Sequence, residues 1–241
     1  MLKKVSRSVI DVDKLRRPGV RLVDTMPRVD VSKELGLDIA VVQAARVSYG
    51  EGSKGVEKDK QLIRYLIRNN HTSPFEMVEF KWHLEMPLFA ARQWMRHRMA
   101  SINEISARYT EVQDTRFIPD LPRRQLQTGN KQCSQGEIKD PNVLRLWGTA
   151  LEMQRRQYSV YKDLCDAGVG REQARMFLPQ NAMTEFYWKI DLHNLLKFLE
   201  LRTHEHAQKE TRDYAIKILG ILEQLCPVTV DAWQQKRGKN G

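Results

Sequence analysis

The sequence predicts an α+β fold in which helices flank an antiparallel sheet and the C-terminal half is mainly helical. The clearest strand is MVEFKWHLEM at residues 77–86, where five apolar residues alternate with charged residues and a histidine. One apolar face and one polar face are typical of an antiparallel sheet. No repeat and no linker interrupts the chain, so we expect a single domain over residues 1–241.

The remaining elements of the N-terminal half follow from local patterns. Alternation in VRLVDTM predicts a strand at residues 20–26. A helix that begins near residue 31 and ends before Gly50 would be capped by Asp30 or Ser32, and residues 56–70 carry apolar side chains at helical spacing. These helices precede the main strand.

After the main strand, Pro87 is expected to open a helix that ends near Arg98. Residues 119–140 are polar and broken, and we expect an exposed loop there. The elements expected after it are helices at 142–166 and 171–177, a strand at 182–190, helical structure over 191–226 and a flexible basic tail at 233–241.

The composition, with 41% hydrophobic and 29% charged residues, is that of a folded globular protein. A formal net charge of +10 indicates anionic partners, and charge alone leaves nucleic acids, membrane surfaces and small phosphorylated ligands open. Cys133, Cys165 and Cys226 form no CxxC pair, which argues against a zinc ribbon or a disulfide framework. No run of about 18 apolar residues occurs, and we expect a cytoplasmic protein without membrane contacts.

Residues 91–111, ARQWMRHRMASINEISARYTE, gather cationic donors around a carboxylate. On a helix, Gln93, Arg96 and His97 fall beside the apolar stripe, a spacing equally compatible with a solvated basic face. The continuation adds hydroxyls, another arginine and Glu104. Arginine suits phosphate, whereas a carboxylate suits the N–H or O–H groups of a base or sugar, so together they favour a nucleotide.

Arg202 lies on the apolar side of the helix that follows residue 191. A cation on such a face needs a partner, because an unpaired buried charge is costly. Two partners remain open: a structural carboxylate such as Glu185, or a ligand that carries or develops negative charge. His193 and Lys197 lie one turn apart on another face and would suit a second anionic group.

Other chemistries have weaker support in the sequence. His204 and His206 would diverge by about 200° on a helix, so we expect no metal site. Ser106 lies in no GxSxG turn, and no cysteine lies in either arginine-rich segment. Glycine-rich phosphate loops are also missing, so we expect a bound cofactor whose phosphates are held by arginines. His71, in the loop before the main strand, is a further candidate for the site.

The segment RHRMASINEIS at residues 96–106 resembles the RHR-x7-S signature of the flavin-dependent thymidylate synthases. Further segments resemble that family in the expected order: AARVSYG at 44–50, HTSPFE at 71–76, REQARMFLP at 171–179, DLHNLLKFLELR at 191–202 and HAQKETRDYA at 206–215. The resemblance covers most of the chain apart from the predicted loop.

The resemblance implies a homotetramer with an α+β fold, in which each active site is shared between subunits around FAD. It further implies methylation of dUMP to dTMP, with the carbon from 5,10-methylenetetrahydrofolate, reduction by NADPH through the flavin, and release of tetrahydrofolate. No protein thiolate is required, in keeping with the lack of a cysteine in the signature.

Carried onto this sequence, the resemblance implies two sets of contacts and one catalytic residue, Arg202, which would sit against the uracil. The dUMP contacts would be Gln93, Trp94, Met95, Arg96, Glu104, Ile105, Ser106, Ala107, Arg108, Arg175 and Arg202. The FAD contacts would be Ser73, Arg96, His97, Arg98, Glu104, Asp191, Leu192, His193 and Lys197, with His71 near flavin and folate.

A basic nucleic-acid-binding protein is the alternative from another class, and the net charge permits it. A phosphate-backbone binder would gain nothing from Glu104 among arginines or from an inward-facing Arg202. We therefore expect small-molecule substrates and no obligatory nucleic acid.

Overall fold

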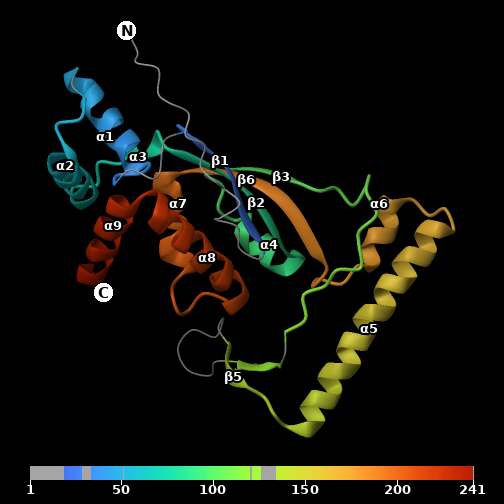
Figure 1. Ribbon diagram of the computed structural model, residues 1–241. Helices are drawn as coiled ribbons and strands as arrows, with labels where there is room; N and C mark the ends of the chain where they lie inside the picture. Colours follow the sequence, from blue (N-terminus) through green and yellow to red (C-terminus); the bar gives the residue numbers. More distant parts are fainter. Residues whose placement is uncertain (1–18, 29–33, 51, 120, 126–133, 241) are drawn as a thin grey trace.

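The structure, a computed structural model, has the α+β fold with an antiparallel sheet that the sequence predicts. It describes residues 19–28, 34–50, 52–119, 121–125 and 134–240. A four-stranded sheet has the order β1-β2-β6-β3, and all neighbouring strands are antiparallel. Its strands are β1 (Val20–Met26), β2 (Glu79–Pro87), β6 (Met183–Asp191) and β3 (Ser101–Glu104) (Figure 1).

The register of the two central strands explains the two faces of the sheet. Trp82 on β2 is paired with Trp188 on β6, and both side chains are fully buried. Because successive side chains of a strand point to opposite faces, Lys81 and Tyr187 lie on the other face and are exposed. The predicted alternation of β2 is thus confirmed.

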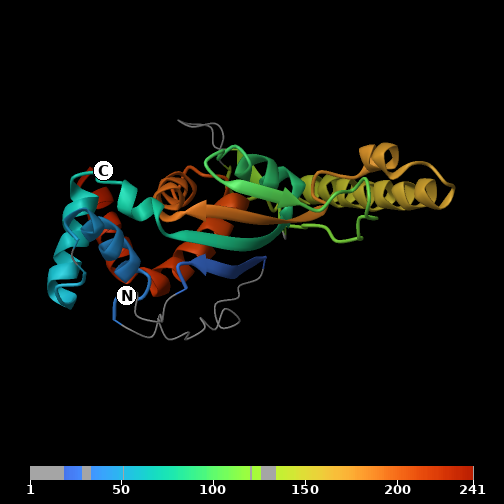
Figure 2. The same cartoon turned by 90° about the horizontal axis from the view of Figure 1, so that it is seen from above.

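Three helices cover the apolar face of the sheet: α4 (Leu88–Trp94), α7 (Leu192–Arg202) and α8 (Lys209–Leu225) (Figure 2). Trp94 lies at the centre of this packing, with its ring 5.2 Å from Trp188 and 4.4 Å from Phe198 between centroids. Aromatic pairs at such distances add to the energy of burial. The rigid core therefore lies directly beneath the arginine-rich segment.

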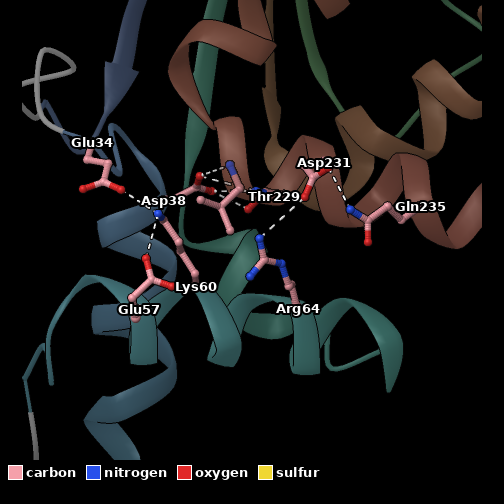
Figure 3. Close-up of polar contacts among 9 residues, drawn as sticks. Glu34, Asp38, Glu57, Lys60, Arg64, Thr229, Asp231 and Gln235 are labelled. Atoms are coloured by element: carbon pink, nitrogen blue, oxygen red, sulfur yellow. Dashed lines mark hydrogen bonds and ion pairs between the residues drawn. The ribbon is translucent and has the colours of Figure 1, made fainter.

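A second group of helices gathers at one end of the sheet (Figure 1): α1 (Asp38–Arg46), η2 (Val47–Tyr49), α2 (Val56–Arg68), α3 (Ser73–Glu76) and α9 (Pro227–Asn240). The buried carboxylate of Asp38 accepts hydrogen bonds from the backbone N–H groups of Val228 and Thr229 at the start of α9 (Figure 3). Lys60 pairs with Glu34 and Glu57 on the surface beside it.

The helices α5 (Pro141–Asp166) and α6 (Arg171–Ala174) lie at the other end of the sheet, where α6 leads into η3 (Arg175–Phe177) (Figure 1). Asp140 caps α5 by accepting hydrogen bonds from the N–H groups of Asn142 and Val143. Although α5 has 26 residues, Tyr161 is its one fully buried residue. Most of this helix is uncovered in the single chain.

Several predicted boundaries are wrong. The first helix begins at Asp38, not near residue 31, and its predicted caps Asp30 and Ser32 lie outside the described residues. The helix after Pro87 ends at Trp94, because the chain then turns into β3, a strand that the sequence analysis missed. The helical prediction for 191–226 is interrupted between α7 and α8 by the turn at 203–208.

The predicted exposed loop at 119–140 is partly wrong, because β4 (Arg123–Gln125) and β5 (Ser134–Glu137) pair within it. Residues 120 and 126–133 lie outside the described part of the chain.

The predicted flexible tail at 233–241 is also wrong up to Asn240, since this stretch belongs to α9. Trp233 is 7% exposed, and Lys236 donates a hydrogen bond to the carbonyl of Ile67 on α2. The basic composition of this stretch predicts a flexible tail, but the buried ring of Trp233 packs α9 against the core. Among the described residues no helix combines the length and apolarity needed to cross a membrane; the cytoplasmic location stays a prediction.

Candidate active site

The arginine-rich segment is anchored by α4 and then leaves the core. Ala91 and Trp94 are buried, whereas Arg96 and Arg98, in the turn before β3, are exposed. Trp94, a predicted dUMP contact, is fully buried against the rings of Trp188, Phe198 and Tyr214, so its side chain does not face a ligand site in the single chain. The segment therefore presents basic groups from a rigid base.

Arg202 meets this segment at the end of α7. Its Nε donates to Nε2 of His97 at 2.9 Å, and its terminal nitrogen donates to the carbonyl oxygen of Gln93 at 3.3 Å. Two residues more than 100 positions upstream thus hold the guanidinium in place. Helical spacing predicts Arg202 on the inner side of α7, and its half-buried position agrees with that prediction.

The partners of Arg202 are neutral. Burial, and then the charge of Arg202, lower the pKa of His97 to about 4, so this imidazole is uncharged near neutral pH and can accept the hydrogen bond. Burial also lowers the pKa of Arg202 itself. Within the described part of the chain no carboxylate pairs with Arg202, and a carboxylate oxygen of Glu185, the predicted structural partner, lies 3.1 Å from Nε2 of His83 instead. The structural ion pair with Glu185 is thus wrong, and the charge remains available.

Gln93 is fixed from the opposite side by α8 and the turn before it. Its side chain donates to the Oε1 of Gln208 and accepts from the hydroxyl of Thr211. Gln208 in turn donates to Glu210, which pairs with Arg123 of β4. Desolvation opposes ionisation of Glu210, but the hydrogen bond from Arg123 helps to keep the pKa of this carboxyl below its usual range. No local pattern predicts this chain of contacts, because Gln93, Arg123 and Gln208 are widely separated in sequence.

A cavity of about 1080 Å³ lies beside β3 and β6, large enough for a nucleotide. Six of the predicted dUMP contacts line it: Met95, Glu104, Ile105, Ser106, Ala107 and Arg175. Glu104 accepts a hydrogen bond from the hydroxyl of Thr184 at 2.6 Å, which orients its carboxylate. Thr184 and Arg92 also line the cavity and were missed, although strand alternation on β6 could have indicated Thr184.

The predicted dUMP contacts do not form one cluster in the single chain. Arg175 follows α6, and Arg202 ends α7; both views show these helices at opposite ends of the sheet (Figures 1 and 2). Arg108 lies outside the lining of the large cavity and approaches Glu172, with a nitrogen–oxygen distance of 3.7 Å. One chain therefore presents two parts of a candidate site.

The predicted FAD contacts are also distributed. His193 and Lys197 line a smaller cavity together with His71. Burial, followed by the charge of Lys197, lowers the pKa of His193. Asp191 caps α7 by accepting from the backbone N–H of Asn194 at 2.9 Å. Its carboxylate is therefore already engaged.

Two other predicted FAD contacts differ in exposure. Ser73 is exposed on α3, whereas Leu192 is fully buried and its backbone N–H already donates to the carbonyl of Val78 at 2.8 Å. In the single chain, neither of the two cavities is lined by all of the predicted FAD contacts.

His204 and His206 do not lie on a helix, so the predicted helical divergence of about 200° between their side chains is wrong. His204 and His206 occupy the turn between α7 and α8, with ring centroids 4.9 Å apart. Among the described residues, one group of three side chains has a spacing that could hold a metal ion: His83, Glu85 and Glu185. His204 and His206 do not belong to it.

Comparison with known proteins agrees with the residue pattern. The Thy1 family model, described as thymidylate synthase complementing protein, matches residues 31–228. A flavin-dependent thymidylate synthase from Dictyostelium discoideum is 47% identical over 89% of this chain and 70% of its own. One from Thermus thermophilus is 49% identical over 90% of this chain and 75% of its own.

A solved structure shares the fold as well. The UMP/dUMP methylase PolB from Streptomyces cacaoi, bound with 5-Br dUMP, is 33% identical, with a TM-score of 0.77. The match covers 90% of this chain and 94% of that one. The family model and the relatives both span most of the sequence, and they confirm the resemblance carried by the RHR-x7-S motif: this chain belongs to the thymidylate synthase complementing protein family, with the flavin-dependent thymidylate synthases.

Proposed function

We propose that this protein is a flavin-dependent thymidylate synthase that methylates dUMP to dTMP. The carbon would come from 5,10-methylenetetrahydrofolate, and tetrahydrofolate would be released. The observation that carries the proposal is the half-buried guanidinium of Arg202, which has neutral partners and no carboxylate within the described residues. The names of the relatives and of the methylase neighbour support the same reaction.

Arg202 would act on the pyrimidine ring of dUMP. A fixed positive charge beside the N3 and O4 side of uracil stabilises negative charge there, which raises the nucleophilicity of C5. The neutral His97 and the carbonyl of Gln93 orient the guanidinium without cancelling its charge. The same charge would be worth less in water, where the solvent screens it.

The large cavity would receive the rest of the nucleotide. Arg175 and the hydroxyl of Ser106 lie in its wall, where they would meet the phosphate. Glu104, oriented by Thr184, would accept a hydrogen bond from an N–H or O–H group of the ligand. The combination of cation, hydroxyl and carboxylate fits a nucleotide better than a nucleic-acid backbone.

The exposed basic residues fit FAD. Arg96 and Arg98 are both exposed, and in the described regions neither makes an ion pair, so both can meet the cofactor's diphosphate. His97, Ser73, His193 and the other predicted contacts would complete the cofactor site. When bound, FAD would carry reducing equivalents from NADPH to the transferred carbon.

The site would be completed by further copies of this chain, in a homotetramer. Three exposed apolar side chains of α5, Leu146, Met153 and Val160, are 69%, 61% and 47% exposed and follow each other at seven-residue intervals. Residues seven apart lie on one side of a helix, so these three side chains form an apolar stripe. A second copy that covers this stripe would lie at the end of the molecule that carries Arg175.

The test combines spectroscopy with product analysis. The purified protein is expected to show flavin absorption or to take up added FAD, and NADPH should bleach that absorption without oxygen. Addition of methylenetetrahydrofolate and dUMP should then yield dTMP, detected by chromatography, while omission of dUMP serves as the control. A protein that binds no flavin under these conditions would contradict the proposal.

A further inference from the structure

A second cavity, of about 250 Å³, lies between α7 and the C-terminal helix α9. Its polar wall contains His71, His193, Lys197, Glu200, Lys236 and Arg237. The last two residues belong to the stretch whose basic character the sequence shows, and nothing in the proposed reaction yet uses them. Trp233, Phe75 and Leu196 supply the apolar part of the wall.

The charges around this cavity are unbalanced. Three of the lining side chains, Lys197, Lys236 and Arg237, are cationic, and Glu200 is the one carboxylate among the lining residues. In the part of the chain that the structure describes, none of the three cations forms an ion pair. Cations gathered around one cavity repel each other, and an anion placed between them removes that cost.

Lys236 is held by neutral oxygens. Its ammonium donates to the carbonyl of Ile67 at 2.8 Å and to Oδ1 of Asn70 at 2.6 Å, both at the end of α2. An ammonium has three donors, so one remains for a ligand. These contacts place the charge at the wall of the cavity and keep its position fixed.

Arg237 is positioned in a similar way. Its guanidinium lies over the ring of Trp233 at 4.7 Å, and it donates to the hydroxyl of Thr203 at 3.3 Å. Trp233 is 7% exposed and belongs to the hydrophobic core, so the ring under the guanidinium is packed in place. A stacked guanidinium keeps several donors in one plane, which suits carboxylate and phosphate groups.

We propose that this cavity is an anion-binding site for the charged end of a co-substrate, in which α9 adds Lys236 and Arg237 to His193 and Lys197 of the proposed flavin site. The volume is below that of a typical cavity for a whole drug-sized ligand, so only one end of the molecule enters. Two co-substrates have such an end: the glutamate carboxylates of the folate donor and the 2′-phosphate of NADPH. This inference rests on the proposed function.

Binding to the flavin-loaded protein tests the site without turnover. Calorimetry compares two matched pairs of probes: pteroylpentaglutamate with pteroylmonoglutamate, and NADP⁺ with NAD⁺. The wild-type protein is expected to prefer the more anionic member of one pair. The variants Arg237→Ala and Lys236→Gln should each reduce that preference about tenfold, the value of one charge-assisted hydrogen bond.

Arg237→Ala removes the guanidinium that lies over Trp233. Lys236→Gln leaves that contact in place, and its amide can still donate to the carbonyl of Ile67, so this variant tests the site even if Arg237→Ala disturbs the packing of Trp233. The control Lys58→Ala removes the same charge from an exposed position on α2 and should leave both preferences unchanged.

Each outcome decides the inference. A preference within the pteroyl pair that the two variants reduce identifies folate as the source of the anion, and one within the pyridine nucleotide pair identifies the reductant. No preference in the wild-type protein, or one that the variants leave intact, overturns the site. A loss confined to FAD affinity also overturns it. Because these readouts are binding ratios, a protein without thymidylate synthase activity that still shows the preference would refute only the proposed function.

Discussion

At the level of single residues, Arg202 is a half-buried cation with a fixed orientation. Arg202 is kept in place by an imidazole nitrogen and a backbone carbonyl, neither of which carries negative charge. Neutral acceptors give direction to the guanidinium at little cost to its field, whereas a carboxylate would have cancelled it. The unsatisfied charge is therefore a property of the site that a ligand can use.

Substitution of Arg202 tests this role. Arg202→Ala should lower the turnover number by about 10²–10³, the usual loss when one donor to a developing negative charge is removed. The variant should still fold and bind FAD, because the side chain is only half-buried. Arg202→Lys keeps the positive charge but lacks the planar guanidinium, so its turnover number is expected to lie between those of the wild-type protein and Arg202→Ala. Near-normal turnover of the alanine variant would remove Arg202 from the mechanism.

His97 makes a separate prediction about pH and stability. Its pKa is about 4 in the folded protein, below the ordinary value of about 6.5 expected after unfolding. Between these values the unfolded chain binds more protons, so protonation lowers the free energy of unfolding as the pH falls from 6.5 toward 4. The stabilisation of the folded protein that comes from its neutral His97 is fully present above pH 6.5 and is lost as the pH falls toward 4.

Urea unfolding of the wild-type protein and His97→Asn at several pH values measures this effect. The difference in the free energy of unfolding between the two proteins should decrease steadily below pH 6.5. A difference that stays constant through this range would show that His97 is not held in its neutral form.

At the level of elements, Asp38 connects the start of α1 to the start of α9. Its buried carboxylate accepts from the N–H of Val228 at 2.7 Å and from both the N–H and the hydroxyl of Thr229. Burial raises the pKa of this carboxyl to about 6, although the hydrogen bonds oppose the shift. Since α9 carries Trp233, Lys236 and Arg237, this cap also supports the wall of the smaller cavity.

Removal of the cap should destabilise the protein. Asp38→Ala leaves buried N–H groups without acceptors and is expected to cost about 1–3 kcal/mol in the free energy of unfolding. Asp38→Asn retains an acceptor oxygen and should cost less. Denaturant unfolding of the two variants would reveal the order, and equal losses would mean that the buried hydrogen bonds are unimportant.

The whole molecule is shaped by a helix that its own chain does not cover. Tyr161 anchors α5, because its buried hydroxyl accepts a hydrogen bond from the backbone N–H of Val112 at 3.0 Å, whereas Leu146, Met153 and Val160 are exposed. An exposed apolar stripe of this length is a common mark of an association surface. The same end of the molecule carries Arg175, the part of the candidate site that lies far from Arg202.

A charge placed on this stripe should separate the subunits. Met153→Glu is expected to shift the protein to smaller species in light scattering and to lower turnover at least about tenfold, because a buried unpaired charge costs several kcal/mol. Ser159→Glu, at an exposed position on another side of α5, adds the same charge and should leave the assembly intact. An unchanged size for Met153→Glu would place the interface elsewhere.

Local sequence patterns predicted much of the fold, because the hydrophobic periodicity of a strand or helix depends only on residues close together in the sequence. The alternation in residues 77–86 predicts β2, and the apolar residues of residues 182–190 predict β6. The prediction failed for β3, whose four residues have an exposed or half-buried pattern and owe their conformation to pairing with β6. It also failed for α9, where the buried ring of Trp233 outweighs the charged residues around it.

The site could be predicted only in its residue types. Motifs and helical periodicity are local, so they were enough to identify the family, the arginine-rich motif and the inward face of α7 that carries Arg202. Tertiary structure alone decided that His97 and Gln93 hold Arg202, that Glu185 does not, and that α9 faces His193 and Lys197 across a cavity. Those contacts join residues far apart in the chain, and their distances depend on how the sheet and helices pack, which no local pattern contains.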